Sequence, residues 1–193
     1  MTARKLRFVT AASLFDGHDA SINIMRRLLQ SKGVEVIHLG HNRSAQEVVE
    51  AALAEDAHAI ALSSYQGGHM EYFKYVRELL DKNGGKNVRI FGGGGGVITP
   101  PEMEELHKSG ITRIYHPNDG TSLGLNGIID DMIAKCDYST IESVDFKKLK
   151  DKKLSSYEVA KVITFIEDNR EFPFEVTAGK IPVFGITGTG GAG

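Results

Sequence analysis

Short apolar runs alternate with longer amphipathic segments from the beginning of the chain to about residue 136. The runs are rich in β-branched and aromatic residues and are too short for helices, so each is predicted to form a β-strand. They occupy residues 6–12, 34–39, 57–63, 88–91 and 112–115.

Each amphipathic segment carries an apolar stripe at helical spacing and is predicted to form an α-helix. Ser44 lies three residues before Glu47, a capping box typical of a helix start, and Pro100 and Pro101 suit the first turn of the fourth helix. The helical segments occupy residues 22–30, 45–55, 71–82, 102–108 and about 122–135.

The strict alternation of strands and helices predicts an α/β fold with a parallel sheet and helices on both faces. We expect a flavodoxin-like (Rossmann-like) five-stranded parallel sheet of order 2-1-3-4-5. Ligands of open α/β sheets bind outside the carboxyl ends of the strands, where the strand order reverses. The loops that leave strands one, three and four are therefore the predicted location of the functional site.

The composition changes after Cys136 to a polar, lysine-rich segment with one helix predicted from Ser155 to about Asn169. Residues 181–187 have the pattern of a new strand. They lead into residues 188–193, which match the opening of a G-x-x-x-x-G phosphate-binding loop, although Lys and Ser/Thr do not follow. We therefore expect a domain over residues 1–136, a solvated linker with a helix over residues 137–180, and the truncated start of a second domain over residues 181–193.

The composition is that of a globular protein with a small-molecule partner. Hydrophobic residues make up 41% and charged residues 25% of the 193 residues, and the formal net charge is −2. This charge provides no broad positive field for nucleic acid. No apolar stretch approaches the ~18 residues of a membrane-spanning helix. We therefore expect neither a nucleic-acid nor a membrane partner.

The single cysteine and the amino-terminal residues both favour a cytoplasmic setting. Cys136 has no second cysteine for an internal disulfide, so a reduced structural thiol is expected. Basic residues precede the first apolar run, but Arg7 interrupts it, and a buried strand fits the run better than a signal peptide does.

The first loop, residues 16–21, puts a histidine beside an aspartate in the predicted crevice. The neutral imidazole of His18 can coordinate a metal through one nitrogen while the other donates to a carboxylate such as Asp16. Alone, such a pair is more often a simple polar contact, and Asp19 has the alternative role of a helix cap.

The third and fourth loops are rich in small residues. Residues 63–69 read Ser-Ser-Tyr-Gln-Gly-Gly-His, and Gly92 to Gly96 form a run of five glycines. Small side chains at strand ends let a planar group approach the backbone. A tight turn needs fewer than five glycines, and each additional glycine costs conformational entropy on folding. A ligand lying against the backbone is therefore favoured over a plain turn, with a phosphate cradle as the competing functional interpretation.

The spacing of the three loops resembles the cobalamin-binding pattern D-x-H-x-x-G, S-x-L and G-G. Asp16-x-His18-x-x-Ser21 is followed after 41 residues by Ser63-x-Tyr65, and then by the glycine run. Ser21 stands where the pattern has glycine, and Tyr65 stands where it has leucine. Both departures remain compatible with the site, but they are expected to narrow the cavity.

Longer stretches resemble the amino-terminal region of the fused isobutyryl-CoA mutases, which are adenosylcobalamin-dependent. These are Phe-Val-Thr-Ala-Ala-Ser-Leu-Phe-Asp-Gly-His-Asp and Val-Ile-His-Leu-Gly-His-Asn-Arg-Ser. The resemblance implies that adenosylcobalamin binds base-off/His-on, with its lower base displaced and His18 as the ligand to cobalt. The implied cofactor-binding residues are Asp16, Gly17, His18, Asp19, Ala20, Ser21, Ser63, Tyr65, Gly67, Gly68, Gly93, Gly94, Gly95, Gly96 and Tyr115.

The same resemblance implies a longer polypeptide. The family joins the cobalamin domain to a GTPase domain, which takes GTP and Mg²⁺, and to a substrate barrel that binds acyl-CoA. Residues 181–193 fall where the P-loop of the GTPase domain would begin. The full-length enzyme is expected to be a homodimer that interconverts isobutyryl-CoA and n-butyryl-CoA. This chain alone is expected to bind cofactor without turnover, because the rearrangement needs the substrate domain.

Two proteins of related architecture are the alternatives. A response-regulator domain needs an aspartate after strand three and a lysine after strand five, where this chain has Ser63 and Tyr115. A corrinoid methyl carrier or cobalamin sensor is the closer alternative. Such proteins carry a helical cap before the cobalamin fold, and the residues that precede His18 in this sequence are too few to form one. The other histidines lack zinc-site spacing and are expected mostly at the surface or at helix ends, with His41 and His69 as candidates for a cofactor or partner contact.

Overall fold

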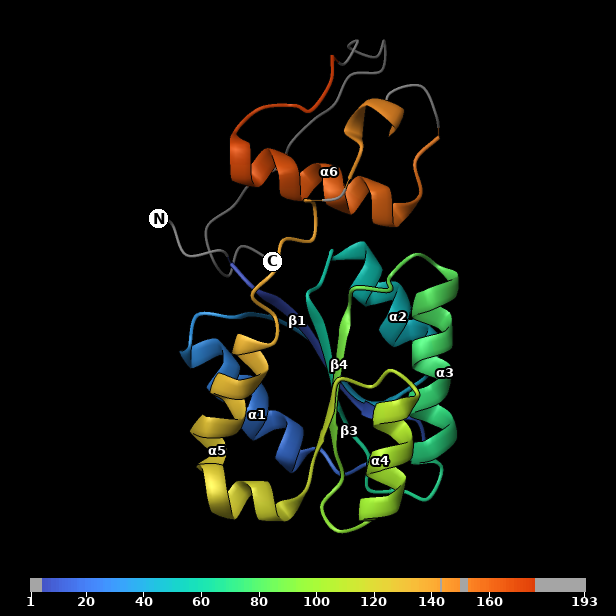
Figure 1. Ribbon diagram of the computed structural model, residues 1–193, viewed down its shortest axis with the longest axis vertical. Helices are drawn as coiled ribbons and strands as arrows, with labels where there is room; N and C mark the ends of the chain where they lie inside the picture. Colours follow the sequence, from blue (N-terminus) through green and yellow to red (C-terminus); the bar gives the residue numbers. More distant parts are fainter. Residues whose placement is uncertain (1–4, 143, 150–152, 176–193) are drawn as a thin grey trace, which may run out of the picture.

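A five-stranded parallel sheet forms the centre of the computed structural model, which describes residues 5–142, 144–149 and 153–175. The strand order is β2-β1-β3-β4-β5, as predicted (Figure 1). The strands are β1 (Arg7–Ser13), β2 (Glu35–Arg43), β3 (Ala59–Ser63), β4 (Arg89–Gly93) and β5 (Arg113–Tyr115).

Helices cover both faces of the sheet. α1 and α5 pack together on one face, while α2, α3 and α4 form a row on the other (Figure 1). The helices are α1 (Ala20–Ser31), α2 (Ala45–Ala54), α3 (His69–Lys82), α4 (Pro100–Lys108), α5 (Pro117–Ala134) and α6 (Ser156–Asn169), with a short 3₁₀ helix, η1 (Phe146–Leu149), before α6.

The strands supply two hydrophobic cores from alternate positions. Val9 and Ala11 of β1 join the core beneath α2, α3 and α4, whereas Phe8 joins the core beneath α1 and α5. Successive side chains of a strand point to opposite faces, so a strand buried on both sides is apolar at nearly every position. Full burial of a side chain such as Phe8 contributes about 1.5–3 kcal/mol.

Two element boundaries differ from the predicted ones in ways that affect the site. β2 continues to Arg43 instead of ending at residue 39, because its pairing with β1 resumes beyond a register irregularity. α5 begins at Pro117 instead of residue 122, because His116 caps the helix there and proline suits its first position. Gly124, with φ of 66°, then kinks α5. Both extensions bring additional residues to the carboxyl edge of the sheet.

The described residues after Cys136 include several that pack onto the domain, while Lys147 and Lys148 stay exposed. The Tyr138 hydroxyl lies 2.6 Å from the His58 carbonyl oxygen and 2.8 Å from that of Asn87, and its one proton is shared between them. The predicted helix is present as α6, and its capping box is formed by Ser155 and Glu158.

α6 is attached by charged side chains at the amino ends of the strands, opposite the carboxyl edge (Figure 1). Lys161 Nζ lies 3.1 Å from Asp56 Oδ1 and donates to the Thr140 carbonyl at 2.6 Å. Arg7, the first residue of β1, forms an ion pair with Glu167 of α6. The helix predicted for the linker therefore packs against the domain predicted over residues 1–136.

Three further predictions concern regions away from the sheet centre. Cys136 is buried, and burial raises the pKa of its thiol to about 12, which fits the expected structural thiol. The strand predicted at residues 181–187 and the glycine-rich residues 188–193 lie outside the described residues. No helix in the described part of the chain is long and apolar enough to span a membrane.

Candidate functional site

Asp16 and His18 form a hydrogen-bonded pair just beyond the carboxyl end of β1. His18 Nδ1 lies 2.8 Å from Asp16 Oδ1, and the His18 backbone amide donates to the same oxygen at 2.9 Å. A carboxylate only accepts, so the ring proton belongs on Nδ1 and the lone pair on Nε2. The His18 side chain is 73% exposed, and its Nε2 is therefore suited to coordinate a metal ion that approaches from outside.

The surroundings of Asp16 keep its carboxylate ionised. Burial favours the neutral acid, but hydrogen bonds from the amides of Tyr65 and His18, and from the His18 ring, hold the pKa of Asp16 below its usual value. The carboxylate therefore remains an acceptor at neutral pH and fixes the tautomer of His18.

The end of β2 clamps the loop that carries this pair. Asn42 Oδ1 accepts from the Phe15 amide at 2.8 Å, and the Asn42 amide donates to the Asp16 carbonyl at 3.3 Å. Phe15 (φ 63°) and Asn42 (φ 56°) both adopt the left-handed region, which asparagine tolerates well and phenylalanine does not. Sequence reasoning missed Asn42 because β2 was expected to end before it.

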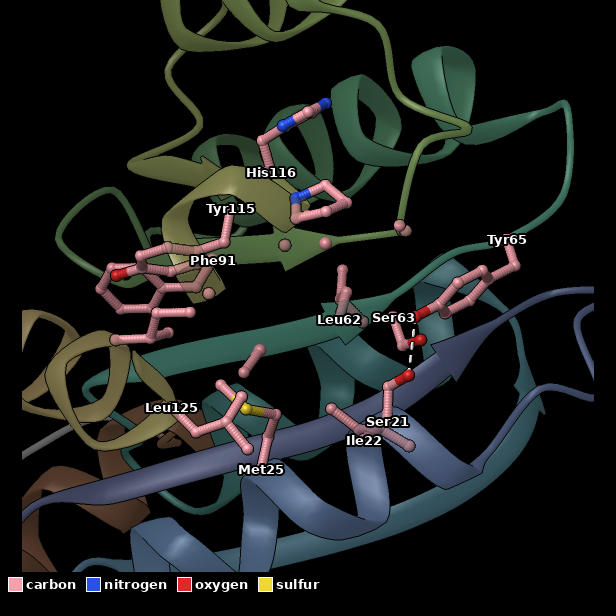
Figure 2. A pocket seen from close by; sticks show the side chains of 18 of the residues that line it. Ser21, Ile22, Met25, Leu62, Ser63, Tyr65, Phe91, Tyr115, His116 and Leu125 are labelled. Carbon is pink, nitrogen blue, oxygen red and sulfur yellow. Dashed lines mark hydrogen bonds between the residues drawn. The ribbon is translucent and has the colours of Figure 1, made fainter. Parts of the chain in front are cut away.

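Tyr65 extends from the loop after β3 to the start of α1. Its hydroxyl lies 2.6 Å from Ser21 Oγ (Figure 2), and its ring centroid is 5.4 Å from that of His18. Ser21 and Tyr65, the two departures from the cobalamin-binding pattern, are therefore in direct contact.

A cavity of about 350 Å³ lies beside the carboxyl ends of β3, β4 and β5. Side chains of α1 and α5 and the aromatic rings of β4 and β5 form its mostly apolar walls (Figure 2). A concave apolar site with a few polar groups is typical of small-molecule binding. The lining residues are Ser21, Ile22, Met25, Ala61, Leu62, Ser63, Tyr65, Phe91, Gly92, Gly93, Gly94, Gly95, Tyr115, His116, Pro117, Gly120, Leu125, Ile128 and Met132.

Ser63 brings an unsatisfied hydroxyl to this cavity. The residue is 4% exposed, and its Oγ finds no hydrogen-bond partner among the residues that the structure describes. The adjacent Ser64 differs, since its Oγ accepts from the Ser13 hydroxyl at 2.8 Å. Leaving a buried hydroxyl unpaired is unfavourable by about 1–3 kcal/mol, so Ser63 is suited to bind a polar atom of a ligand.

The five glycines of residues 92–96 are explained partly by packing within the protein and partly by contact with a ligand. A Cβ at Gly92 would lie 2.4 Å from the Phe73 ring, and one at Gly94 would lie 1.9 Å from the Ser64 carbonyl oxygen. Both distances are far shorter than real Cβ contacts allow. Packing therefore accounts for part of the run, whereas a Cβ at Gly93 meets only the Tyr115 carbonyl at 3.4 Å.

Tyr115 offers the cavity an aromatic ring rather than a reactive hydroxyl. Its hydroxyl donates to Asp131 Oδ2 at 2.7 Å, and burial together with this carboxylate raises the pKa of Tyr115 well above its usual value. Its ring stacks on Phe91 with centroids 6.4 Å apart. The phenol therefore stays protonated and engaged, and its flat surface forms part of the wall.

The structure gathers most of the predicted site residues around one edge. Ser21, Ser63, Tyr65, Gly93, Gly94, Gly95 and Tyr115 line the cavity, and Asp16, Gly17, His18, Asp19 and Ala20 lead into α1 beside it. Of the remaining predicted residues, Gly67, Gly68 and Gly96 do not belong to the described lining, and Gly68 caps α3 instead. Sequence reasoning missed the apolar walls; the helical spacing of Ile22 and Met25 was the available signal.

The expectation that the other histidines lie mostly at the surface or at helix ends is confirmed for His41, which is exposed, and for His69, His107 and His116, which lie at helix ends, but not for His58. His58 and His69 are 3% and 4% exposed, although His69 is also the first residue of α3. His69 Nδ1 lies 3.2 Å from the Gln66 carbonyl, and its Nε2 lies 3.4 Å from Glu102 Oε2. His69 therefore lies between the third loop and α4, where its buried Nε2 has no hydrogen bond among the described residues, whereas His116 lines the cavity.

Comparisons with known proteins agree with this geometry. The family model described as "B12 binding domain" matches residues 6–126. A fused isobutyryl-CoA mutase of Cupriavidus metallidurans is 55% identical over 99% of this chain, and one of Geobacillus kaustophilus is 52% identical over 97%. The crystal structure of a cobalamin-binding protein from Desulfitobacterium hafniense has a TM-score of 0.57 and 17% identity, over 68% of this chain and 60% of that one, which shows a shared fold.

These relatives are much longer proteins. The chain spans 18% of the length of the Cupriavidus metallidurans protein and 19% of the length of the Geobacillus kaustophilus protein. The similarity therefore concerns one region of each relative.

Proposed function

The chain belongs to the B12-binding domain family, and from that premise we propose that it carries adenosylcobalamin in the base-off/His-on state for an acyl-CoA mutase. His18 is the protein ligand to cobalt in this proposal. The observation that carries it is the Asp16–His18 pair, in which an ionised, buried carboxylate orients an exposed imidazole with its lone pair on Nε2.

The cavity beside this pair supports the base-off part of the proposal. A displaced lower base is a flat aromatic group, and the cavity of about 350 Å³ has aromatic and aliphatic walls from Phe91, Tyr115 and α5. The buried Ser63 hydroxyl, which lacks a partner among the described residues, supplies a hydrogen bond to the nucleotide tail. Gly93 leaves space for close approach to the backbone.

The chain's own residues bind and orient the group. When bound, adenosylcobalamin supplies a cobalt–carbon bond whose homolysis starts radical chemistry. His18 would donate an electron pair to cobalt through Nε2, and Asp16 would hold the proton on Nδ1 and so orient the ring. The apolar walls exclude water from the tail. No residue of this chain is assigned to the rearrangement of the substrate.

The named relatives support a proposal about the whole enzyme. We propose that residues 1–136 are the cobalamin domain, that residues 137–180 connect it onward, and that residues 181–193 begin a P-loop GTPase domain that takes GTP and Mg²⁺. The full-length protein would then be a cytoplasmic homodimer whose substrate barrel interconverts isobutyryl-CoA and n-butyryl-CoA. The isolated chain would bind cofactor without turnover.

A spectroscopic titration tests the cobalt ligand. The chain is mixed with adenosylcobalamin, and its visible absorption is compared with that of His18→Ala. We expect a base-off spectrum with histidine coordination for the wild type and loss of that coordination in His18→Ala. His107→Gln is the control, because His107 lies in the last turn of α4, outside the predicted site and the cavity lining, and glutamine can still accept from the Ile114 amide. A wild-type spectrum in which the cofactor keeps its own base on cobalt would contradict the proposal.

A further inference from the structure

We infer that Tyr65 is a positioning residue for His18, with its ring and its hydroxyl together fixing the imidazole in the orientation that coordinates cobalt. The inference rests on the proposed function, because it concerns how the protein ligand is held. Tyr65 follows β3 and His18 precedes α1, so they are distant in the sequence and meet only in the fold.

Tyr65 contacts both members of the Asp16–His18 pair. Its backbone amide donates to Asp16 Oδ2, while Asp16 Oδ1 accepts from His18 Nδ1. Its side-chain ring lies 5.4 Å from the imidazole ring between centroids, at an interplanar angle of 39°. One residue therefore fixes the carboxylate through its main chain and packs against the imidazole through its side chain.

The ring contact restrains motion that the hydrogen bond leaves free. A single bond at Nδ1 fixes one atom of the imidazole, yet 73% of the His18 side chain is exposed and its torsions retain freedom. An adjacent aromatic ring removes some of these orientations before the metal arrives. Preorganisation of this kind raises affinity by lowering the entropy lost on binding.

Two neighbours hold the Tyr65 side chain in place. Ser21 Oγ, on the first turn of α1, lies 2.6 Å from the Tyr65 hydroxyl (Figure 2). In the fourth loop, a Cβ at Gly95 would lie 2.9 Å from Tyr65 Cε1, a distance that real Cβ atoms essentially never show. The tyrosine ring thus occupies space that only glycine leaves, and three loops meet at it.

Ser21 and Tyr65 are also the two positions at which the chain departs from the D-x-H-x-x-G and S-x-L pattern. Glycine and leucine have no hydroxyl and cannot form this bond, whereas here both residues carry one and the two hydroxyls bond to each other. The two departures are therefore one structural feature rather than independent substitutions.

The test compares Tyr65→Leu and Tyr65→Phe with wild type in the 193-residue chain, with cob(II)alamin as the probe. Electron paramagnetic resonance detects the nitrogen on the cobalt through hyperfine splitting, and ¹⁵N-labelled histidine distinguishes a protein imidazole from the cofactor's own base. We expect roughly tenfold weaker binding and a mixed axial-ligand signal for Tyr65→Leu. Tyr65→Phe keeps the ring but loses the Ser21 bond, and we expect roughly threefold weaker binding.

Tyr75→Phe is the matched control, since Tyr75 is an exposed tyrosine of α3, and it should behave as wild type. Wild-type affinity and a uniform histidine-coordinated signal in Tyr65→Leu would overturn the inference and leave the proposed function intact. A wild-type signal that does not respond to ¹⁵N-histidine would overturn the proposed function itself. If Tyr65→Leu does not fold, Tyr65→Phe and Ser21→Ala decide, and unchanged signal and affinity in both would overturn the inference.

Discussion

The Asp16 carboxylate is fully buried, while the His18 side chain to which it is hydrogen-bonded at 2.8 Å is 73% exposed. The pair thereby separates two requirements of a metal ligand. The anion that sets the tautomer is fixed inside the protein, and the nitrogen that donates faces outward. This division explains why the loop needs both residue types two positions apart.

Asp16→Asn is expected to lower the affinity for adenosylcobalamin by about 10- to 100-fold, the usual effect of losing a residue that orients a metal ligand. The asparagine amide has the size of the carboxylate but forms a weaker, uncharged hydrogen bond. Its NH₂ group can also donate to Nδ1 and so allow the imidazole tautomer that carries its proton on Nε2. A spectral titration measures the change. Asp130→Asn, at a 59% exposed carboxylate on α5, is the control and should bind as wild type. Equal affinity in both variants would contradict the assigned role of Asp16.

Ser63→Ala is expected to change stability and binding in opposite directions. Without cofactor, the variant should be as stable as wild type or about 1 kcal/mol more stable, because the buried hydroxyl lacks a partner among the described residues. With adenosylcobalamin, the affinity should fall roughly fivefold, as expected for one lost hydrogen bond. Thermal unfolding and spectral titration of the same samples provide the two measurements.

Ser64→Ala is the matched control for this prediction. Ser64 Oγ accepts from Ser13 at 2.8 Å, so its removal leaves a buried hydroxyl unpaired and should destabilise the chain by about 1 kcal/mol. If Ser63→Ala and Ser64→Ala destabilised the cofactor-free chain equally, the conclusion that the Ser63 hydroxyl lacks a partner among the described residues would be wrong.

The fold and the edge that carries the site could be predicted from sequence because they depend on local patterns. A strand buried on both faces is an apolar run, and strict alternation with helices dictates a parallel sheet whose order reverses beside β1. The walls of the cavity from α5 could not be predicted in this way. Gly120 and Gly124 interrupt the helical pattern of that segment, and the start of the helix at Pro117 was missed.

The contacts between loops depend on distances that no sequence pattern contains. Ser21 and Tyr65 were identified as departures that narrow the cavity, but their hydrogen bond follows from the way in which α1 and β3 approach each other. The glycine run was attributed mainly to a ligand, whereas Phe73 and the Ser64 carbonyl also require it. Neither neighbour is adjacent to the run in the sequence.

Gly94→Ala is expected to destabilise the chain by about 3 kcal/mol, since the new Cβ would meet a main-chain oxygen, that of Ser64, at 1.9 Å. The backbone of the third or fourth loop must move, and cofactor binding should weaken with it. Gly96→Ala is the control, because a Cβ there meets nothing within 4 Å, and its effect should stay within about 0.5 kcal/mol. Chemical denaturation distinguishes the two; equal stabilities would show that the loop relaxes freely.

The lowered pKa of Asp131 predicts that the free energy of unfolding decreases in acid. Burial opposes its ionisation, but Lys135, the Tyr115 hydroxyl and Arg113 hold the pKa of Asp131 below its usual value. A carboxyl whose pKa is lower in the folded state contributes stability above its unfolded pKa of about 3.9, and this stability is lost as the pH falls through the folded value. The free energy of unfolding should therefore decrease below about pH 4, and less steeply in Asp131→Asn. Urea denaturation across this range measures both slopes, and identical slopes would contradict the prediction.

Lys161→Met tests whether α6 belongs to the domain without serving the site. The lysine is 13% exposed and pairs with Asp56, which is 1% exposed, so its loss leaves a buried carboxylate without its cation. We expect a loss of about 3 kcal/mol in the free energy of unfolding. Affinity for adenosylcobalamin should not change, because α6 lies at the amino ends of the strands and the site lies at the carboxyl ends (Figure 1). Lys148→Met, at a lysine that is 82% exposed, should alter neither quantity. An unchanged stability in Lys161→Met would mean that the Asp56 pair does not hold α6, whereas weaker binding would mean that the two ends of the sheet are coupled.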